Sequence, residues 1–123
     1  MLTEEQTTKI IETIADELPG FIAAALVDLE SGMTLGMYTT RSDFDLSAAS
    51  AYNSEIVKQK QKVMQALGIQ GDLEDMTMTL TDQVHVIKIV SDGSFLYLAA
   101  SKDGSNLALI RNAIKSHVDE LAA

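Results

Sequence analysis

Hydrophobic residues recur along this chain with two spacings, one typical of helices and one typical of strands. Apolar positions three or four residues apart predict amphipathic helices over about residues 3–17, 46–67 and 106–120. Shorter apolar or alternating stretches, bounded by turn residues, predict five strands, at residues 21–27, 33–38, 75–80, 84–90 and 95–100. Short loops join the last three strands, which favours an antiparallel meander. The predicted order of elements is α-β-β-α-β-β-β-α.

The stretch Phe21–Val27 is apolar at every position. A strand of this kind needs cover on both faces, so it is expected in the middle of a sheet with helices packed on each side. The strand at 95–100 has the same character and belongs in the centre as well. The strands at 33–38 and 75–80 alternate between apolar and polar residues, and this pattern places them at the edges of the sheet.

Two helix starts carry capping signals. Thr3 and Gln6 have the spacing of a capping box, in which each side chain bonds the backbone N–H of the other residue. Asp43 or Asp45 is placed to cap the long helix that follows. These signals set the start of the first helix near residue 3 and that of the second near residue 46.

Both predicted edge strands are half-buried by pattern. In the first, Met33, Leu35 and Met37 form one face, and Thr34, Gly36 and Tyr38 form the other. In the second, the apolar face consists of Met76, Met78 and Leu80. An uncovered edge strand with high β propensity and little charge is a template for pairing with another chain. We therefore expect the strand at 75–80 to pair with its counterpart in a second copy, giving a twofold dimer.

The long helix has more apolar surface than one contact needs. A main stripe runs along it, with a narrower row made of Val57 and Met64 beside the stripe; the stripe consists of Ala49, Tyr52, Ile56, Val63 and Leu67. Two apolar rows indicate two packing contacts for the helix, one with the chain's own sheet and one with a second surface. Gln59 interrupts the stripe. Either its side chain forms a helix–helix hydrogen bond at a dimer seam, or the stripe drifts outward at this position. The predicted dimer interface is Ile56, Gln59, Val63, Met76, Met78 and Leu80.

The composition excludes several classes of function. The chain has 123 residues, which predicts a single domain over residues 1–123. The net charge of −9 argues against nucleic acid and against an anionic membrane surface, because both need clustered lysine and arginine. There is no cysteine, and no apolar run approaches the length of a membrane span. We expect a cytoplasmic protein that does not insert into membranes.

No catalytic or cofactor-binding motif is found in the sequence. It lacks the phosphate-binding glycine motifs and the G-x-S-x-G pattern of hydrolases. The two histidines, His85 and His117, lie on different predicted elements without the spacing of metal ligands. His85 is expected to be a packed or edge residue, and His117 a surface residue near the end of the last helix. We therefore expect no enzyme activity, no metal and no cofactor.

Several stretches taken in order resemble the Roadblock / dynein light-chain domain family. They are Pro19–Asp28 with Gly32 in the first hairpin, Asp45–Ser50 at the start of the central helix, Gly93–Leu98 in the last strand and Asn106–Arg111 in the last helix. The resemblance implies an α+β fold with a five-stranded antiparallel sheet in the order 2-1-5-4-3. The first and last helices would lie on one face and the long helix on the other.

The resemblance also implies a function. Members of the family are homodimeric, non-enzymatic adaptors or regulators of Ras-like GTPases, or motor light chains. The expected partners are therefore a second copy and a small Ras-like GTPase. The proposed partner-binding surface lies on the paired long helices at Lys58, Lys60, Lys62 and Met64, although such a lysine cluster is also typical of a solvated helix face.

Two other functions remain open at this point. A sensor domain of profilin or longin type would bind a small ligand between sheet and helix, in a pocket lined by Tyr52, His85 and Tyr97. A pure scaffold, or a light chain associated with a motor, would hold other proteins together with no effect on nucleotide turnover. A tightly packed core around the pocket residues would count against the sensor.

Overall fold

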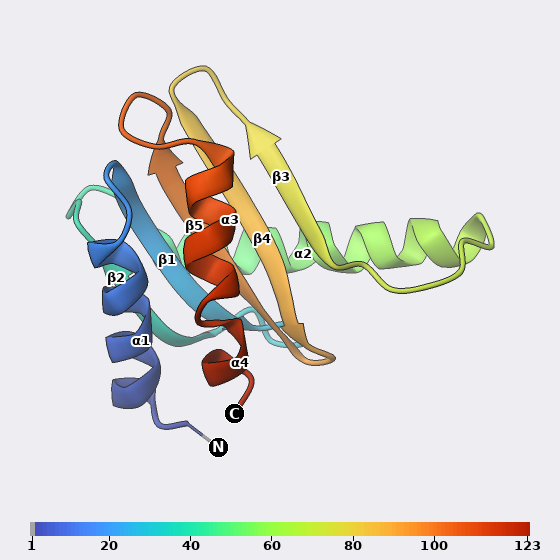
Figure 1. Cartoon of the computed structure of the whole chain (residues 1–123). Coiled ribbons are helices and arrows are strands. Elements are labelled where there is room, and N and C mark those ends of the chain that lie inside the picture. The colour runs from blue at the N-terminus through green and yellow to red at the C-terminus, as the bar shows by residue number, and fades with distance from the viewer. Residues whose placement is uncertain (1) are drawn as a thin grey trace.

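The computed structural model describes residues 2–123, which form a five-stranded sheet between two layers of helices (Figure 1). The elements are α1 (Glu4–Asp16), β1 (Phe21–Asp28), β2 (Thr34–Thr39), α2 (Leu46–Ala66), β3 (Asp75–Thr79), β4 (Gln83–Ser91), β5 (Ser94–Ser101), α3 (Leu107–Lys115) and α4 (Val118–Leu121). The strands are antiparallel to their neighbours in the order β2-β1-β5-β4-β3. This confirms the fold class and the strand order that the resemblance implies.

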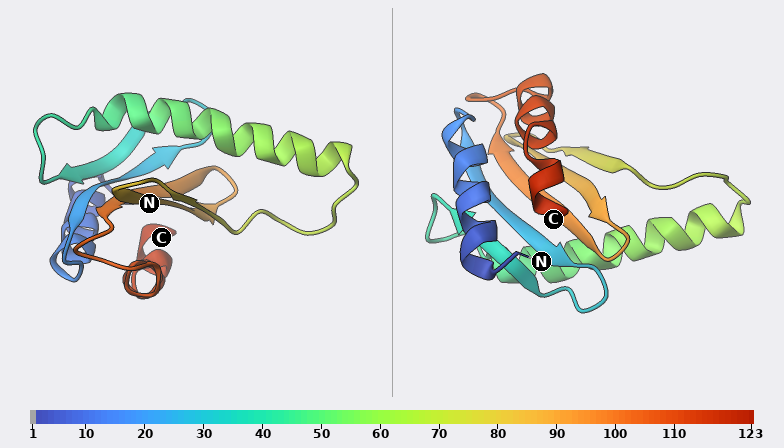
Figure 2. Two further views of the ribbon diagram at one scale, coloured as in Figure 1. Left: turned by 90° about the horizontal axis from the view of Figure 1, so that it is seen from above. Right: turned by 60° about the horizontal axis from the view of Figure 1, so that its bottom comes forward.

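The helices cover opposite faces of the sheet. Seen from above, α2 lies on one side, and α1, α3 and α4 lie on the other (Figure 2). On the side of α1 and α3, the buried cluster joins residues of those two helices to alternate residues of β1, β4 and β5. On the α2 side, Val57 packs with the other residues of these strands, including Ile87, Phe95 and Tyr97. The sheet is therefore the shared wall of two hydrophobic cores.

The predicted central strand is buried throughout. Each residue from Phe21 to Val27 is less than a tenth exposed, because β1 lies between β2 and β5 and has helices on both faces. The predicted capping box at Thr3 and Gln6 is present, with both reciprocal bonds formed. Asp45 caps α2 by accepting a hydrogen bond of 3.0 Å from the backbone N–H of Ala48.

The last helix differs from the continuous one predicted to residue 120. It ends at Lys115, the backbone leaves helical geometry at His117 with φ −125° and ψ −3°, and the short α4 follows. This break turns the chain back toward the sheet, so that Leu121 is 4% exposed and joins the core beside α1. The burial of Leu121 and the contacts of the His117 side chain therefore offset the loss of helical bonds at the break.

The apolar face predicted for the strand at 33–38 is the more exposed one. Leu35 and Met37 are 41% and 44% exposed, whereas Gly36, on the other face, is buried. α1 packs on the Gly36 face, where a Cβ at position 36 would lie only 2.6 Å from Cγ2 of Thr7. A glycine within a strand often marks such a close approach. The close packing of α1 therefore determines which face of β2 is covered.

Only the first half of α2 rests on the sheet. Its buried residues are Leu46, Ser50, Asn53, Ser54 and Val57, and none follows Val57. A helix of 21 residues is about 31 Å long, and Figures 1 and 2 show its C-terminal half projecting past the strands. The three buried polar side chains bond to carbonyls within α2, at 2.7–2.8 Å. These small, internally satisfied residues let the first half approach the sheet closely.

Candidate protein-binding surface

The broad apolar stripe of α2 is exposed in the single chain. Tyr52 is 74% exposed, Leu67 is 70% exposed, and Ile56 and Val63 are 39% and 36% exposed. Val57 of the narrower row faces the sheet and is fully buried. The sheet-facing side was hard to recognise from the sequence because Ser50, Asn53 and Ser54 occupy much of it. The wider of the two apolar rows is therefore the one left without a contact.

The residues predicted for the dimer interface lie on one side of the sheet. Ile56, Gln59 and Val63 follow one another along the exposed stripe at helical spacing. Met76 and Met78 are half-buried and pack against the cluster on the α2 side. Leu80 is 46% exposed and lies just beyond the end of β3.

The outer edge of β3 is open. This strand pairs with β4 on one side and is the last strand of the sheet among the described residues. Its backbone N–H and C=O groups on the other side are available to a further strand. An open strand edge and an exposed helix stripe are therefore both accessible in the single chain.

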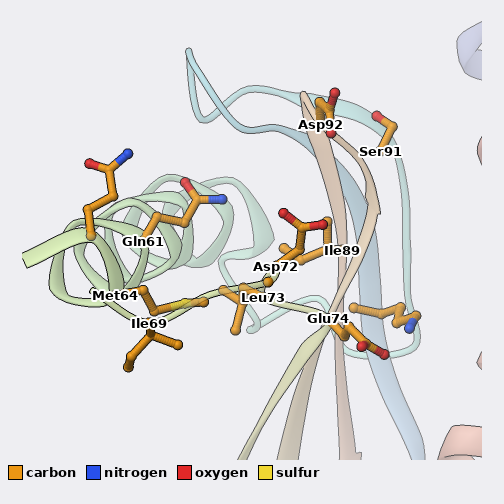
Figure 3. A pocket seen from close by; sticks show the side chains of 12 residues that line it. Gln61, Met64, Ile69, Asp72, Leu73, Glu74, Ile89, Ser91 and Asp92 are labelled. Carbon is orange, nitrogen blue, oxygen red and sulfur yellow. The ribbon is translucent and has the colours of Figure 1, made fainter. Parts of the chain in front are cut away.

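A cleft lies beneath the projecting half of α2 (Figure 3). Its volume is about 480 Å³, and it separates the helix from the loop leading into β3 and from the end of β4. Met64, Ile69 and Leu73 gather below the helix, as Figure 3 shows, and Ile89 lines the strand side. Asp72, Glu74 and Asp92 add carboxylates to the lining. The cleft combines an apolar floor with a surround of three carboxylates and one cation, Lys88.

The three lysines predicted to bind a partner do not form one patch. At about 100° per residue, Lys58 and Lys62 lie on the same side of α2, and Lys60 lies on the opposite side. The Nζ atom of Lys58 donates a hydrogen bond of 2.9 Å to the backbone carbonyl of Glu30, and it lies 3.4 Å from the Glu55 carboxylate. Lys58 is therefore tied to the β1–β2 turn, whereas Lys60 and Lys62 are exposed.

The residues predicted to line a ligand pocket fill the space themselves. Tyr97 is 1% exposed, and its ring packs edge-on against His85 with the ring centres 5.5 Å apart. Tyr52 is exposed on the other side of α2 and does not join them. This packing is consistent with the expectation that His85 is a packed or edge residue. The close contact of His85 with Tyr97 counts against a sensor pocket between the sheet and the helix.

The hydrogen bonds of His85 determine its protonation. Burial raises the pKa of Tyr97 to about 12, so its hydroxyl keeps its proton and donates to Nδ1 of His85, 3.1 Å away. Burial also lowers the pKa of His85, which favours the neutral ring. The remaining N–H, on Nε2, then donates to Oε1 of Gln83 at 2.7 Å. The three side chains form a neutral, satisfied chain of hydrogen bonds.

His117 is not the surface residue expected from the sequence. Its side chain is 14% exposed, with Nε2 2.8 Å from Glu17 and Nδ1 2.7 Å from Glu120. Hydrogen bonds to Glu17 and then to Glu120 raise the pKa of His117. Since both ring nitrogens face carboxylates, the charged ring, which donates from both, is the favoured form. No signal in the sequence pairs residues so far apart along the chain.

The fold has clear counterparts among solved structures, although no family model and no curated protein matches the sequence. A structure of MglB in a tetrameric arrangement matches with a TM-score of 0.85 at 15% identity, covering 99% of this chain and 89% of that one. The gliding protein MglB of Thermus thermophilus matches equally well, with a TM-score of 0.85 and 15% identity over 99% of this chain and 90% of that one. A Roadblock/LC7 domain from Streptomyces avermitilis matches with a TM-score of 0.76 at 15% identity, over 94% and 98% of the two chains. The chain has the Roadblock/LC7 fold.

Within this Roadblock/LC7 fold, the described residues offer accessible surfaces for binding. No group of three or more His, Asp or Glu side chains in residues 2–123 is arranged to hold a metal ion. No helix in that range has the length and apolar character needed to cross a membrane. The prominent features of the described residues are the exposed α2 stripe, the open β3 edge and the cleft beneath α2.

Proposed function

We propose that the chain is a homodimer in which α2 and β3 of each copy meet α2 and β3 of the other. The observation that carries this proposal is the projecting half of α2, which has apolar side chains and no sheet beneath it. A second copy would cover Ile56 and Val63, pair the open β3 edges and bring an apolar surface to the cleft at Met64. One twofold contact would satisfy all of these features. The expected interface includes Ile56, Gln59, Val63, Met76, Met78 and Leu80.

The mass of the protein in solution tests the dimer. Sedimentation equilibrium at micromolar concentration is expected to give twice the chain mass of 13.3 kDa. Replacing both Ile56 and Val63 by aspartate should shift the equilibrium to the monomer, since charge would enter an apolar seam. Leu109→Asp is the matched control, because Leu109 is 44% exposed on α3, on the far side of the sheet. A wild-type mass of one chain at about 100 µM would reject the proposal, since stable homodimers are far tighter than this.

We further propose that this dimer acts in the cytoplasm as a non-enzymatic regulator that binds a small Ras-like GTPase. Support comes from the resemblance of the sequence to a family of GTPase regulators and from the fold shared with MglB and Roadblock/LC7 domains. Such a regulator shifts the equilibrium between the two arrangements of the GTPase's switch segments only by its difference in affinity for them. The open faces of α2 are the proposed contact. Lys60 and Met64 lie on one of these faces and Lys62 lies on the other, while Lys58 mainly holds the helix in place.

Binding and turnover assays test this function separately. The probe is a small Ras-like GTPase of the same organism, sought first among the genes that neighbour this one, and loaded with GDP or with a non-hydrolysable GTP analogue. Calorimetry is expected to show tighter binding to one nucleotide state, and Lys60→Glu with Lys62→Glu should weaken it by about tenfold. The control is Lys102→Glu, an exposed charge in the loop after β5. Equal binding to both states with unchanged GTP hydrolysis would favour the pure scaffold.

A further inference from the structure

A basic groove lies on the face of the sheet opposite α2. It has a volume of about 270 Å³ and runs between α3 and the β3–β4 hairpin. Lys88 of β4 and Arg111 and Lys115 of α3 surround it, and Val86, Ile114 and Val118 supply apolar lining. Val86 and Ile114 are buried, at 1% and 3% exposed. The groove thus combines an aliphatic floor with a cationic rim.

The charge of this groove is opposite to that of the rest of the protein. The chain has 18 acidic and 9 basic residues, and three of the basic ones meet here. Lys88 and Lys115 form no ion pair with any residue in the described range 2–123. The only carboxylate lining the groove belongs to Asp75, which lies 3.6 Å from Nη2 of Arg111. Two lysines are therefore left with free charge above an apolar floor.

The guanidinium of Arg111 is held at the mouth of the groove. Besides Asp75, its Nη2 lies 3.4 Å from Oγ1 of Thr77, so that β3 positions a side chain that comes from α3. The side chain remains 52% exposed. Its remaining N–H donors can therefore reach a ligand without first breaking a buried contact.

We propose that this groove is a docking site for an acidic segment of a partner protein, one in which a leucine or similar side chain is flanked by carboxylates. Charge complementarity selects the carboxylates, and the apolar floor selects the aliphatic side chain. Nucleic acid and anionic membranes do not fit, because three cations on a chain of net charge −9 cannot supply the positive surface they need. The site lies on the opposite face from the α2 stripe and does not depend on the proposed dimer. A protein with both surfaces can bridge two partners.

The test uses the full chain and a designed probe, a short helical peptide with one leucine between glutamates. The protein's backbone amide shifts are followed by NMR during titration at low salt. The expected shifts cluster at Lys88, Arg111 and Lys115, and the same peptide with glutamine in place of glutamate should bind at least about tenfold more weakly. Binding should also weaken as salt rises, because the rim is exposed. Shifts spread over the surface, or centred on α2, would overturn the proposal.

Matched variants separate the groove from bulk charge. Lys88→Gln with Lys115→Gln removes two charges at the groove, and Lys9→Gln with Lys102→Gln removes two at exposed positions elsewhere, so that the net charge is the same. Only the first pair should weaken peptide binding, by about tenfold. Equal weakening by both pairs, or no binding of the peptide to the wild-type protein, would overturn the proposal. Octanoate binding as tightly as the peptide would also overturn the proposal, because it would indicate a site for small organic acids. Groove signals that shift with protein concentration alone would overturn it as well, because they would indicate that a second copy occupies the groove.

Discussion

Nε2 of His117 lies 2.8 Å from a carboxylate oxygen of Glu17, a residue one hundred positions earlier in the chain. Glu17 caps the end of α1, and His117 stands at the break between α3 and α4. The second ring nitrogen bonds Glu120 within α4. One imidazole therefore fastens the C-terminal segment to the first helix, and it does so best when it carries a charge.

His117→Gln is expected to destabilise the protein in a pH-dependent way. The pKa of His117 is raised in the folded state, so its stabilising effect is fully present below the ordinary histidine value of about 6.5 and is lost as the pH rises through the raised value. The wild type should exceed the variant in unfolding free energy by about 1 kcal/mol at about pH 6, since the bonds are charge-assisted but their carboxylates are partly exposed. Urea unfolding from about pH 6 to pH 9 measures this difference. A difference that stays constant over this range would contradict the charged contact.

Gly36→Ala should be costly because α1 lies directly over position 36. The new methyl group would come within 2.6 Å and 2.7 Å of the Thr7 side chain, and Thr7 is itself buried. Overpacking of this kind costs about 1–3 kcal/mol. Thermal or urea unfolding measures it, with Gly93→Ala as the control, since a Cβ at that turn position meets nothing within 4 Å. Equal effects of the two substitutions would mean that α1 packs elsewhere.

Val57→Ala and Ile56→Ala should separate folding from association, although the two residues are neighbours in the chain. Val57 is fully buried against the sheet, so its truncation should lower the unfolding free energy by about 1–3 kcal/mol. Ile56 is 39% exposed, and its truncation should leave the fold nearly unchanged while weakening self-association. Urea unfolding and sedimentation, applied to both variants, measure the two effects. The reverse outcome would mean that α2 is rotated about its axis.

Tyr97→Phe should cost about 1 kcal/mol, because it leaves Nδ1 of His85 without a donor in a half-buried position. Urea unfolding near neutral pH measures the loss. The raised pKa of Tyr97, about 12, adds a second signature. The stabilisation it represents is present below the ordinary tyrosine value of about 10 and is lost as the pH rises toward 12. In an absorbance titration, the variant should lack the phenol that ionises in the highest pH range.

The central strands of the sheet could be predicted from the sequence because each of them follows a single hydrophobic pattern. The run from Phe21 to Val27 is apolar at every position, has the length of a strand and is flanked by turn residues, which together favour a covered strand. Short loops restrict the last three strands to a meander. The caps at Thr3 and Asp45 depend on residues three positions away, so local sequence is enough to predict them.

The contacts between elements were less accessible to sequence reasoning. Ser50, Asn53 and Ser54 are polar, but they face the sheet because they satisfy their hydrogen bonds within α2. The more exposed face of β2 is the apolar one, because Gly36 lets α1 approach from the other side. The break at His117 depends on a partner at the far end of the chain. In each case a tertiary contact, invisible to periodicity, decides the outcome.

The pairing of β1 with β5 joins the beginning of this chain to its end, from Phe21 opposite Ala100 to Asp28 opposite Ser94. During synthesis, β1 leaves the ribosome long before β5 has been made. The edge of β1 that pairs with β5 therefore stays unpaired while the intervening chain is translated. The central sheet can close only after β5 has been translated. A chaperone that shields β1 in this interval would raise the yield of folded protein, and slow translation of the last third would lower it.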